Sequence, residues 1–474
     1  MTETTQTQRK GFRSFFGTQD MTQGKPMRNL LMFAIPLLIG NFAQQLYSTA
    51  DSIIVGRFVG DHALAAVGAS GPVQNLILVL FMAVSTGAGI IVSQYFGAKD
   101  REQLSKSVGN AVILIVIAGL ITTAIGLLAA RPLMRLLGTP DEIFDMSCVY
   151  LEIVFGGMLA IAVYNIVSGI LRGLGDSVTP LMFLLIACGL NIVLDYIFIR
   201  YFGWGVAGAA IATVFSQFVS AVLCLIRLFR MKDTLDLNRE TVRFSKERSA
   251  QLLKLGLPAG ITQGIFSMAM VIVQALTNSM GTLVIACSVA VMRVDGFAML
   301  PNFTFGMATS TFVGQNIGAG RLDRVKEGSR AAITLSMAVA ATLTIALLIF
   351  GRTMIGWFTE TEAIMDLGMR QLRILAVGYL AMGAMQVYAG IMRGAGDTMP
   401  SMWISLVTTV LLRVPTAYIW AHFTKSEQWP NGSPDALYFS LLVAWVAGAL
   451  LNYLWYRRGN WKEKSIIRKA PQEA

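Results

Sequence analysis

Long runs of apolar residues dominate the pattern of the chain, and short polar segments separate them. A helix needs about 20 predominantly apolar residues to cross the hydrocarbon core of a bilayer, which is about 30 Å thick. Strands of a membrane barrel would show alternating segments of about ten residues, so the pattern favours helices. The sequence therefore predicts an all-α polytopic membrane protein with twelve transmembrane helices. The predicted spans lie at residues 29–56, 63–92, 107–130, 143–171, 177–199, 205–229, 251–279, 283–313, 328–350, 364–392, 398–420 and 436–456.

Two segments of the chain recur at a fixed distance, which indicates an internal duplication. RGLGDS at 172–177 returns 221 positions later as RGAGDT at 393–398, and QYFGA at 94–98 returns at the same distance as QNIGA at 315–319. Each RGxGD segment follows one apolar run and precedes the next. Glycine ends a helix and aspartate caps the following one, so we interpret these segments as tight loops between helices. The twelve helices are therefore predicted to form two pseudo-symmetric lobes of six.

The duplication and the apolar runs together give the predicted organisation of the chain. Six spans per half is an even number, so both halves have the same orientation in the membrane. This arrangement is common in secondary transporters, in which the substrate cavity lies between the halves. The predicted parts are an N-terminal tail at 1–28, a six-helix lobe at 29–229, a linker at 230–250, a second six-helix lobe at 251–456 and a tail at 457–474.

The net charge of +11 first suggests a nucleic-acid partner, but the positions of the basic residues favour another explanation. With the N-terminus in the cytoplasm, 28 of the 38 Lys and Arg residues fall in inner segments or at the inner ends of spans, six in outer loops and four deeper within spans. This bias follows the positive-inside rule. It predicts a multi-pass protein of the cell (plasma) membrane with the linker and both termini in the cytoplasm. Neither nucleic acid nor an obligatory protein partner is implied.

Composition and motifs also exclude several classes of protein. Hydrophobic residues make up 55% of the chain and charged residues 14%, whereas charged residues make up about 25% of an ordinary soluble domain. The sequence contains no GxxxxGK[ST] nucleotide-binding loop, so an ion gradient or a partner chain must supply the energy for transport. We therefore expect a carrier for a small molecule rather than an enzyme, with no catalytic residues and no cofactor other than H⁺ or Na⁺ as the coupling ion.

Four acidic residues fall inside the predicted spans and more than two residues from either end, where an unpaired charge costs about 2.5–3.5 kcal/mol or more. They are Asp51, Glu152, Asp195 and Asp295. Asp195 follows Asn191 by four residues, so these two share one helix face. At about 1.5 Å per residue from the inner starts of their helices, Asp51 and Asp195 both reach the outer half of the membrane. They are predicted to face one cavity.

Two carboxylates and an amide in one cavity are suited to a small cation or a proton. Two carboxylates that lie close together in a low-dielectric site cannot both ionise easily, so one would hold a proton near neutral pH and release it when the cavity opens to water. Na⁺ is also compatible, because carboxylates and the Asn191 carbonyl are hard oxygen ligands. The hypothesis is a coupling-ion site made by Asp51, Asn191 and Asp195, for either H⁺ or Na⁺.

Other polar residues in the spans are weaker candidates, for the substrate cavity or for a structural network. Asp295 on the eighth predicted helix and Arg413 on the eleventh reach compatible depths, which favours a structural salt bridge. Arg293 would belong to the same network or line the cavity. The remaining candidates for the cavity are Gln44, Tyr47, Gln263 and Gln386.

The combination of these motifs resembles the multidrug and toxic compound extrusion (MATE) family over roughly residues 28–457. The resemblance rests on the duplication, the two RGxGD[ST] loops, QNIGAG at 315–320 and NIVLD at 191–195. It implies a V-shaped pair of six-helix lobes that exports organic cations or other amphiphiles in exchange for inward-moving H⁺ or Na⁺. It also implies a cation site in the first lobe, at positions that match Asp51, Asn191 and Asp195.

The chain departs from one pattern of the family, and a second function stays open. NorM-like members place acids for a Na⁺ site on the seventh and tenth helices, whereas these spans carry Gln263 and Gln386 here and no central carboxylate. The alternative function is a flippase for lipid-linked saccharides or another amphiphile. A flippase for polyanionic head groups should line its cavity with several arginines, but only Arg293 and Arg413 are central. A non-transporting scaffold would not explain the acids of the first lobe.

Overall fold

The computed structural model describes residues 17–467, and this part of the chain consists of helices and the loops between them, without strands. The predicted tails at 1–28 and 457–474 lie partly outside the described residues. The predicted all-α fold class is confirmed.

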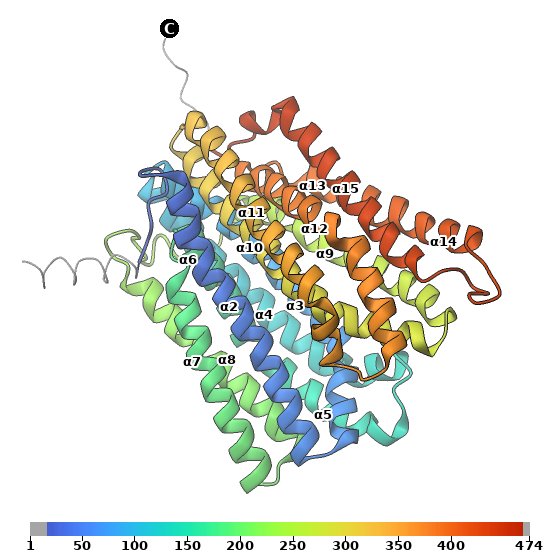
Figure 1. Cartoon of the computed structure of the whole chain (residues 1–474). Coiled ribbons are helices and arrows are strands. Elements are labelled where there is room, and N and C mark those ends of the chain that lie inside the picture. Colours follow the sequence, from blue (N-terminus) through green and yellow to red (C-terminus); the bar gives the residue numbers. More distant parts are fainter. Residues whose placement is uncertain (1–16, 468–474) are drawn as a thin grey trace, which may run out of the picture. The chain divides into compact units, whose positions relative to one another are not determined.

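The helices follow one another along the chain in the order of the labels and colours of Figure 1. Two segments, η1 and η2, are π-helical, and η3 is a 3-10 helix. The bounds are α2 Pro26–Phe58, α3 Asp61–Gly97, α4 Arg101–Leu136, α5 Asp141–Gly156, α6 Met158–Gly173, α7 Val178–Tyr196, η1 Ile197–Tyr201, α8 Gly205–Arg230, α9 Lys246–Ser279, α10 Thr282–Gly318, α11 Leu322–Gly356, α12 Glu362–Ala395, α13 Met399–Ser405, η2 Leu406–Leu412, α14 Arg413–Phe423, α15 Asp435–Arg458 and η3 Asn460–Glu463.

Among the described residues, 11 helices are long and apolar enough to cross a membrane, and a twelfth span results if the bent pair α5 and α6 is counted as one. These two helices meet at 51°, with Gly157 between them. A Cβ atom on Gly157 would lie 2.4 Å from the Val214 side chain, so the close approach to α8 requires glycine. The number of predicted spans is confirmed, with the fourth of them broken at this glycine.

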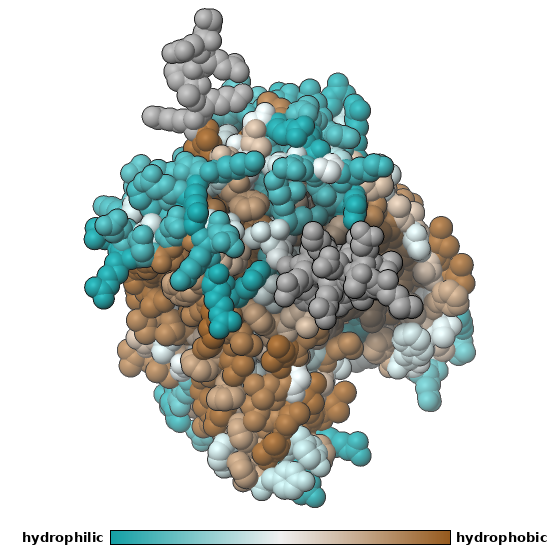
Figure 2. All heavy atoms as spheres, turned by 90° about the vertical axis from the view of Figure 1, so that its left-hand side faces the viewer, coloured by the Kyte–Doolittle hydropathy of each residue, from teal (hydrophilic) through white to brown (hydrophobic). Residues whose placement is uncertain are grey.

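Apolar side chains cover much of the outside of the protein. Leu128, Leu136 and Phe423 are each more than four-fifths exposed. Figure 2 shows broad hydrophobic areas on one face, with hydrophilic residues gathered toward its upper and lower ends. Soluble monomers rarely expose such contiguous apolar surface, whereas a surface that faces lipid must be apolar.

The contacts between helices divide the chain into two compact units. Within the described residues, unit 1 comprises the stretch up to Asp20 together with Ile35–Leu257, and unit 2 comprises Met21–Ala34 together with the stretch from Pro258 onward. The units differ from the predicted lobes in two places, because the start of α2 belongs to unit 2 and the linker with the start of α9 belongs to unit 1. Both changes of unit occur at or beside prolines, Pro36 in α2 and Pro258 in α9, where the helical hydrogen bonding is interrupted.

The duplication is visible in the packing inside each unit. In unit 1, α3 and α6 approach so closely that a Cβ atom on Gly169 would lie 2.2 Å from Ser85 Oγ. In unit 2, α10 and α12 make the same approach, because a Cβ atom on Gly390 would lie 2.3 Å from the backbone oxygen of Gly306. The residues of the second pair each lie 221 positions after those of the first. The two halves therefore share a helix-packing scaffold as well as a sequence motif.

The RGxGD loop of unit 1 joins α6 to α7, as predicted. Gly175 has a φ of +83°, and a Cβ atom there would lie 2.2 Å from the backbone oxygen of Gln19, so the position requires glycine. The buried carboxylate of Asp176 accepts hydrogen bonds from the backbone nitrogen (2.9 Å) and the hydroxyl (2.7 Å) of Thr179. It also lies 3.5 Å from the guanidinium of Arg227. Asp176 thus caps α7.

The second copy of the loop keeps the turn but uses its aspartate differently. Gly396 ends α12 in the left-handed conformation, with a φ of +89°. The Asp397 carboxylate accepts a hydrogen bond from the indole nitrogen of Trp455 at 3.1 Å, rather than from the start of α13. The prediction of a capping aspartate is confirmed for Asp176 and wrong for Asp397, because α15 supplies a competing donor in unit 2.

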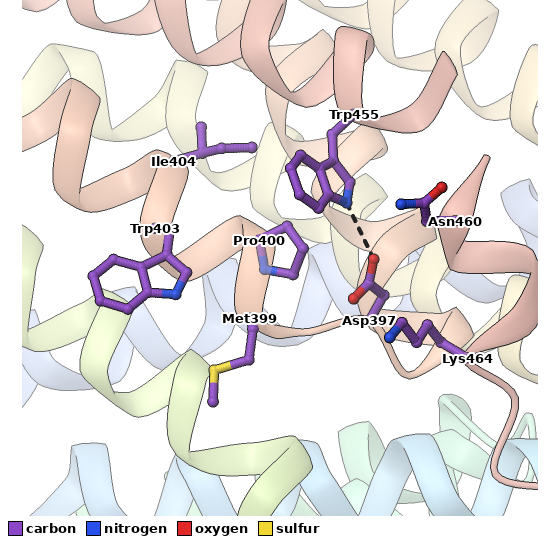
Figure 3. Close-up of a pocket in the computed structure, with 8 residues that line it drawn as sticks. All are labelled: Asp397, Met399, Pro400, Trp403, Ile404, Trp455, Asn460 and Lys464. Atoms are coloured by element: carbon purple, nitrogen blue, oxygen red, sulfur yellow. Dashed lines mark hydrogen bonds between the residues drawn. The ribbon is translucent and has the colours of Figure 1, made fainter. Parts of the chain in front are cut away.

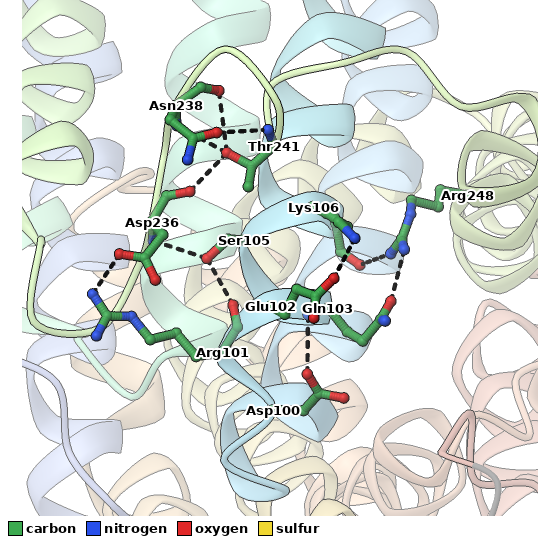
Figure 4. A network of polar contacts seen from close by, with 11 residues as sticks. Asp100, Arg101, Glu102, Gln103, Ser105, Lys106, Asp236, Asn238, Thr241 and Arg248 are labelled. Atoms are coloured by element: carbon green, nitrogen blue, oxygen red, sulfur yellow. Dashed lines mark hydrogen bonds and ion pairs between the residues drawn. The ribbon is translucent and has the colours of Figure 1, made fainter.

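The predicted linker at 230–250 belongs to unit 1, where it packs against α4 (Figure 4). Asp236 pairs with Arg101 at 2.6 Å, and its backbone nitrogen donates a hydrogen bond to Ser105 Oγ at 2.9 Å. Arg248, at the start of α9, donates a hydrogen bond to Gln103 Oε1 at 2.7 Å. These contacts attach the linker and the start of α9 to the first turns of α4.

The segment before α2 is held in unit 2 in a comparable way. The buried Arg324 side chain donates hydrogen bonds to the backbone oxygens of Met21, Gln23 and Gly24, at 3.0 to 3.2 Å. Gln315 Oε1 accepts a further hydrogen bond from the backbone nitrogen of Met21 at 2.9 Å. The position at which α2 begins is therefore fixed by α10 and α11.

Candidate functional site

The three residues of the predicted coupling-ion site come together inside unit 1. Asp51 lies on α2, whereas Asn191 and Asp195 lie one turn apart on α7. Asn191 and Asp195 are fully buried, and Asp51 is 9% exposed. The carboxylates of Asp51 and Asp195 lie close enough to interact electrostatically. The two helices therefore bring their acidic residues to one place.

Thr213 on α8 connects the two helices of this site. Tyr47 on α2 donates a hydrogen bond through its hydroxyl to Thr213 Oγ1 at 3.3 Å, and Asn191 Nδ2 donates to the same oxygen at 3.3 Å. An amide that donates through its nitrogen keeps its carbonyl oxygen available as an acceptor. Thr213 thus orients Asn191 so that Oδ1 is left for a ligand. We call Asp51, Asn191, Asp195 and Thr213 the oxygen cluster.

Several oxygens of the oxygen cluster are buried without a hydrogen-bond partner. They are Asp51 Oδ1, Asn191 Oδ1 and both carboxylate oxygens of Asp195. Buried polar atoms in proteins are normally paired, because an unpaired one loses its hydration without compensation. No ion pair of the described residues involves Asp51 or Asp195. A proton or a small cation would satisfy these oxygens.

The local course of the helices explains how the oxygen cluster is placed. Helices α2 and α7 pack closely at Gly40, where a Cβ atom would lie 3.4 Å from the Leu181 side chain. Two residues after Asp195, α7 passes into the π-helical segment η1, Ile197–Tyr201. Short π-helical segments inside helices often occur at functional sites, because they displace the following residues relative to regular α-helical register.

Two residues beside the acids were not predicted from the sequence. One is Thr213, and the other is Tyr150 on α5, which is 5% exposed and interacts electrostatically with both Asp51 and Asp195. Each is a single polar group in an apolar span. Many such groups occur along the chain, and the position along a helix does not tell which of them meet.

The predicted pair of Asp295 and Arg413 lies inside unit 2, on α10 and α14. The two residues interact electrostatically, and Tyr379 on α12 lies beside Asp295. Their nitrogen and oxygen atoms do not approach within 4.0 Å in the described structure, so the predicted direct salt bridge is not formed. Opposite charges in a low-dielectric interior stabilise each other at longer range as well. Asp295 and Arg413 therefore interact at longer range, beside Tyr379, rather than through the expected direct contact.

The weaker candidates for the substrate cavity differ in how exposed their side chains are. Gln44, Gln263 and Arg293 have exposed side chains. Gln386 is buried at 6% exposure, where α12 packs against α10. Of these candidates, Tyr47 is the residue that contacts the oxygen cluster.

A pocket of about 470 Å³ lies elsewhere in unit 2, beside the RGxGD loop (Figure 3). Its polar chemistry is limited, because the Asp397 carboxylate already accepts a hydrogen bond from Trp455. No residue predicted for the ion site or the substrate cavity lines this pocket. The lining residues are Asp397, Met399, Pro400, Trp403, Ile404, Trp455, Asn460 and Lys464.

The chain is similar to a known family over both of its halves. The MatE family model matches residues 36–197 and again residues 258–419. The second match begins and ends 222 positions after the first, so one copy of the family's repeat covers each half.

Curated relatives and solved structures match nearly the whole chain. "Probable multidrug resistance protein YoeA" of Bacillus subtilis (strain 168) is 29% identical over 461 residues, which cover 95% of this chain and 97% of the relative. "Probable multidrug resistance protein YpnP" of the same organism is 30% identical and covers 94% and 98%. The crystal structure of a MATE in the straight conformation has a TM-score of 0.87 at 26% identity and covers 94% of this chain and 100% of that one.

Proposed function

We propose, on the premise that this chain belongs to the MATE family of multidrug efflux transporters, that it is a secondary active antiporter. It exports organic cations or other amphiphilic compounds across the cell membrane in exchange for H⁺ or Na⁺, by alternating access. Members of this family are membrane efflux carriers, so the chain is a transporter and not an enzyme. Its partners are a small-molecule substrate and the lipid bilayer.

The observation that carries this proposal is the set of partnerless buried oxygens in the oxygen cluster. Two adjacent carboxylates repel each other when both are ionised, and the repulsion disappears when a proton or a cation binds. Because one acid lies on α2 and the other on α7, occupancy of the site favours arrangements in which these helices stay together. A bound ion can bias the conformation of unit 1 only to the extent that it prefers one arrangement to the other.

The donor set of the site suits a monovalent ion. It offers two carboxylates and one amide oxygen, which are hard oxygen ligands, whereas the Thr213 hydroxyl already accepts hydrogen bonds from Tyr47 and Asn191. The described residues contain no group of three or more His, Cys, Asp or Glu side chains that could hold a metal ion. Both H⁺ and Na⁺ are compatible with these ligands.

The names of the relatives, which describe multidrug resistance or multidrug export, support drug-like compounds as substrates. Besides the two proteins of Bacillus subtilis, "Multidrug export protein MepA" of Staphylococcus aureus (strain MRSA252) is 24% identical over 391 residues, which cover 82% of this chain and 86% of the relative. These names describe the relatives, and we extend the substrate class to this chain as part of the proposal.

Efflux from proteoliposomes tests the proposal. Several lipophilic cations are loaded, and a pH gradient and a Na⁺ gradient are imposed separately. We expect one of the two gradients to drive efflux in the wild type and in Thr49→Ala, a control that removes an exposed hydroxyl bonded only to Gln45 of the same helix. Asp51→Asn should not respond to that gradient. Wild-type efflux that ignores both gradients would contradict the proposal.

The proposal includes an orientation in the cell membrane with both termini in the cytoplasm. The support is the excess of basic residues in the predicted inner segments. A cysteine placed at Ser426, after α14, should react with an impermeant reagent from outside, and one placed at Ser245, before α9, only after permeabilisation. The four native cysteines are buried, which lowers the background. The opposite labelling would reverse the orientation.

A further inference from the structure

We propose that Asp295, Tyr379 and Arg413 form a second proton-binding site, in unit 2, at which the acid that takes up the proton is also the counter-ion of a partly buried arginine. The inference rests on the proposed antiport function and adds a second ionisable switch to it. Protonation of Asp295 removes the charge that balances Arg413, so proton uptake and the position of Arg413 become linked.

The first support is that three helices direct polar atoms into one apolar interior. Asp295 Oδ1 and Arg413 Nε are buried and have no hydrogen-bond partner, and the buried Tyr379 hydroxyl lies beside the Asp295 carboxylate. Tyr379 is 1% exposed and belongs to the hydrophobic core of unit 2, where its ring lies 5.9 Å from that of Trp445. A purely structural charge pair would be expected to have its remaining donors and acceptors satisfied.

The second support is the charge balance of the site. Asp295 and Arg413 carry opposite charges, act on each other electrostatically and yet are not in direct contact. With the acid ionised, the pair has no net charge. With the acid protonated, the guanidinium is left as an uncompensated cation in a low-dielectric interior, which is unfavourable. Arg413 then gains by moving toward water or toward another partner.

The third support is the helix that carries the arginine. The π-helical segment η2, Leu406–Leu412, ends directly before Arg413, between α13 and α14. The corresponding stretch of unit 1, residues 185–191, is regular α-helix within α7. A π-helical segment is less regular than the α-helix around it and is common at functional sites. The eleventh span is therefore locally adaptable at the point where the arginine has to move.

The titratable groups that act on Asp295 come from three neighbouring helices. They are Tyr379 on α12, Arg413 on α14 and Tyr438 on α15. In the described structure α11, which also packs against α10, presents no titratable group to Asp295. Arg293 lies on the same helix as Asp295 but is exposed. Tyrosines do not ionise near neutral pH and arginine stays protonated, so Asp295 is the group of this cluster that can exchange a proton.

Infrared difference spectroscopy of the purified protein, between acidic and alkaline buffer, tests whether Asp295 takes up a proton. A protonated carboxyl group has a C=O stretching band that an ionised one lacks. We expect the wild type to show such a band that is absent in Asp295→Asn and retained in Asp51→Asn. Glu152→Gln serves as a matched control, because Glu152 pairs with Arg131 at the surface and should not affect the band. Identical carboxyl bands in the wild type and Asp295→Asn at every pH would overturn the proposal.

The double variant Asp295→Asn with Arg413→Gln controls for misfolding, because it removes both charges of the pair and leaves neither uncompensated. We expect it to fold and to transport. If Asp295 exchanges a proton during the cycle, the slope of the logarithm of the efflux rate against pH should fall by about one, as for the loss of one proton. An unchanged slope would mean that the pair is only structural and would overturn the proposal.

The two experiments separate this inference from the proposed function. If the wild type does not exchange substrate for an ion at all, the antiport function fails, and the infrared measurement on Asp295 is still decisive for the proton site. If exchange occurs and the double variant keeps the wild-type pH slope, the antiport function stands and the second site is wrong.

Discussion

Unit 1 and unit 2 share a helix-packing scaffold but hold different charges in their interiors. In unit 1, Asp51 and Asp195 lie together without a basic partner among the described ion pairs. In unit 2, the partly buried acid Asp295 lies near Arg413. When ionised, the first interior is negative and attracts a cation, whereas the second is balanced and becomes positive only when it takes up a proton.

The difference in interior charge between the two units is not explained by the internal duplication. At the offset of 221 to 222 positions, Asp51 corresponds to Ile272 or Val273, and Asp195 to Thr416 or Ala417. In the reverse direction, Asp295 corresponds to Gln74. The glycine contacts and the RGxGD turns are present in both copies, but the ionisable residues are not. The repeat therefore specifies how the helices pack, and the chemistry of each unit is set by ionisable residues that are not shared between the two copies.

The comparison predicts that coupling depends on the oxygen cluster of unit 1. The largest effect should come from Asp51→Asn, which removes a charge but keeps the shape and hydrogen-bonding capacity of the side chain. We expect ion-driven efflux to fall to the background of empty proteoliposomes, while the variant remains folded and inserted, as judged by size-exclusion chromatography. Wild-type efflux from this variant would remove Asp51 from the coupling site.

The next effect should come from the two cluster residues on α7. Asp195→Asn and Asn191→Ala each remove an oxygen ligand or its charge. Loss of about 1.4 kcal/mol of ion-binding free energy would raise the ion concentration needed for half-maximal efflux about tenfold. The matched changes in unit 2 are Gln263→Ala and Gln386→Ala, which should alter substrate affinity at most. If these glutamine changes shift the ion dependence and the α7 changes do not, the coupling site lies in unit 2.

A smaller effect is expected at Thr213, which acts by orienting Asn191 and Tyr47. Thr213→Val keeps the shape but removes the shared acceptor of two neutral hydrogen bonds, each worth about 0.5–1.5 kcal/mol. We expect ion affinity to fall about threefold to tenfold, with little change in the maximal rate. Thr213→Ser restores an acceptor and should behave like the wild type. Equal loss in Val and Ser variants would mean that the methyl group, not the hydroxyl, matters.

The twelve spans, the duplication and the buried acids of the oxygen cluster could be predicted because their physical cause is local in the sequence. A span needs a length of apolar chain, and a buried acid such as Asp51 or Asp195 needs a reason to be in a membrane. The break between α5 and α6 also had a local signal, the adjacent pair Gly156 and Gly157, which marks a site where the backbone can bend.

The remaining features depend on contacts between distant segments. Thr213 becomes part of the site only because α8 packs beside α7. The direct salt bridge between Asp295 and Arg413 was expected because the two residues lie at compatible depths in the membrane. Depth along two helices does not fix the distance between the helices or their rotation about their own axes. The π-helical segment η2 and the assignment of the start of α2 to unit 2 likewise result from packing that no periodicity encodes.

The smallest functional effect is expected from changes in the RGxGD loops. There the two units should differ only in how much each loop contributes to the stability of the protein. Asp176 is fully buried and bonds to the backbone and hydroxyl of Thr179 and to Arg227, whereas Asp397 accepts a single hydrogen bond from Trp455. Hydrogen bonds to a charged group contribute about 1.5–3 kcal/mol, so Asp176→Ala should destabilise the protein by about 2–3 kcal/mol and Asp397→Ala by about 1.5 kcal/mol. Thermal unfolding in detergent should show the lower Tm for Asp176→Ala, with the ion dependence of efflux unchanged in both variants. Equal Tm values would mean that the two loops contribute alike despite their different contacts, and a shifted ion dependence would show that the loops take part in coupling.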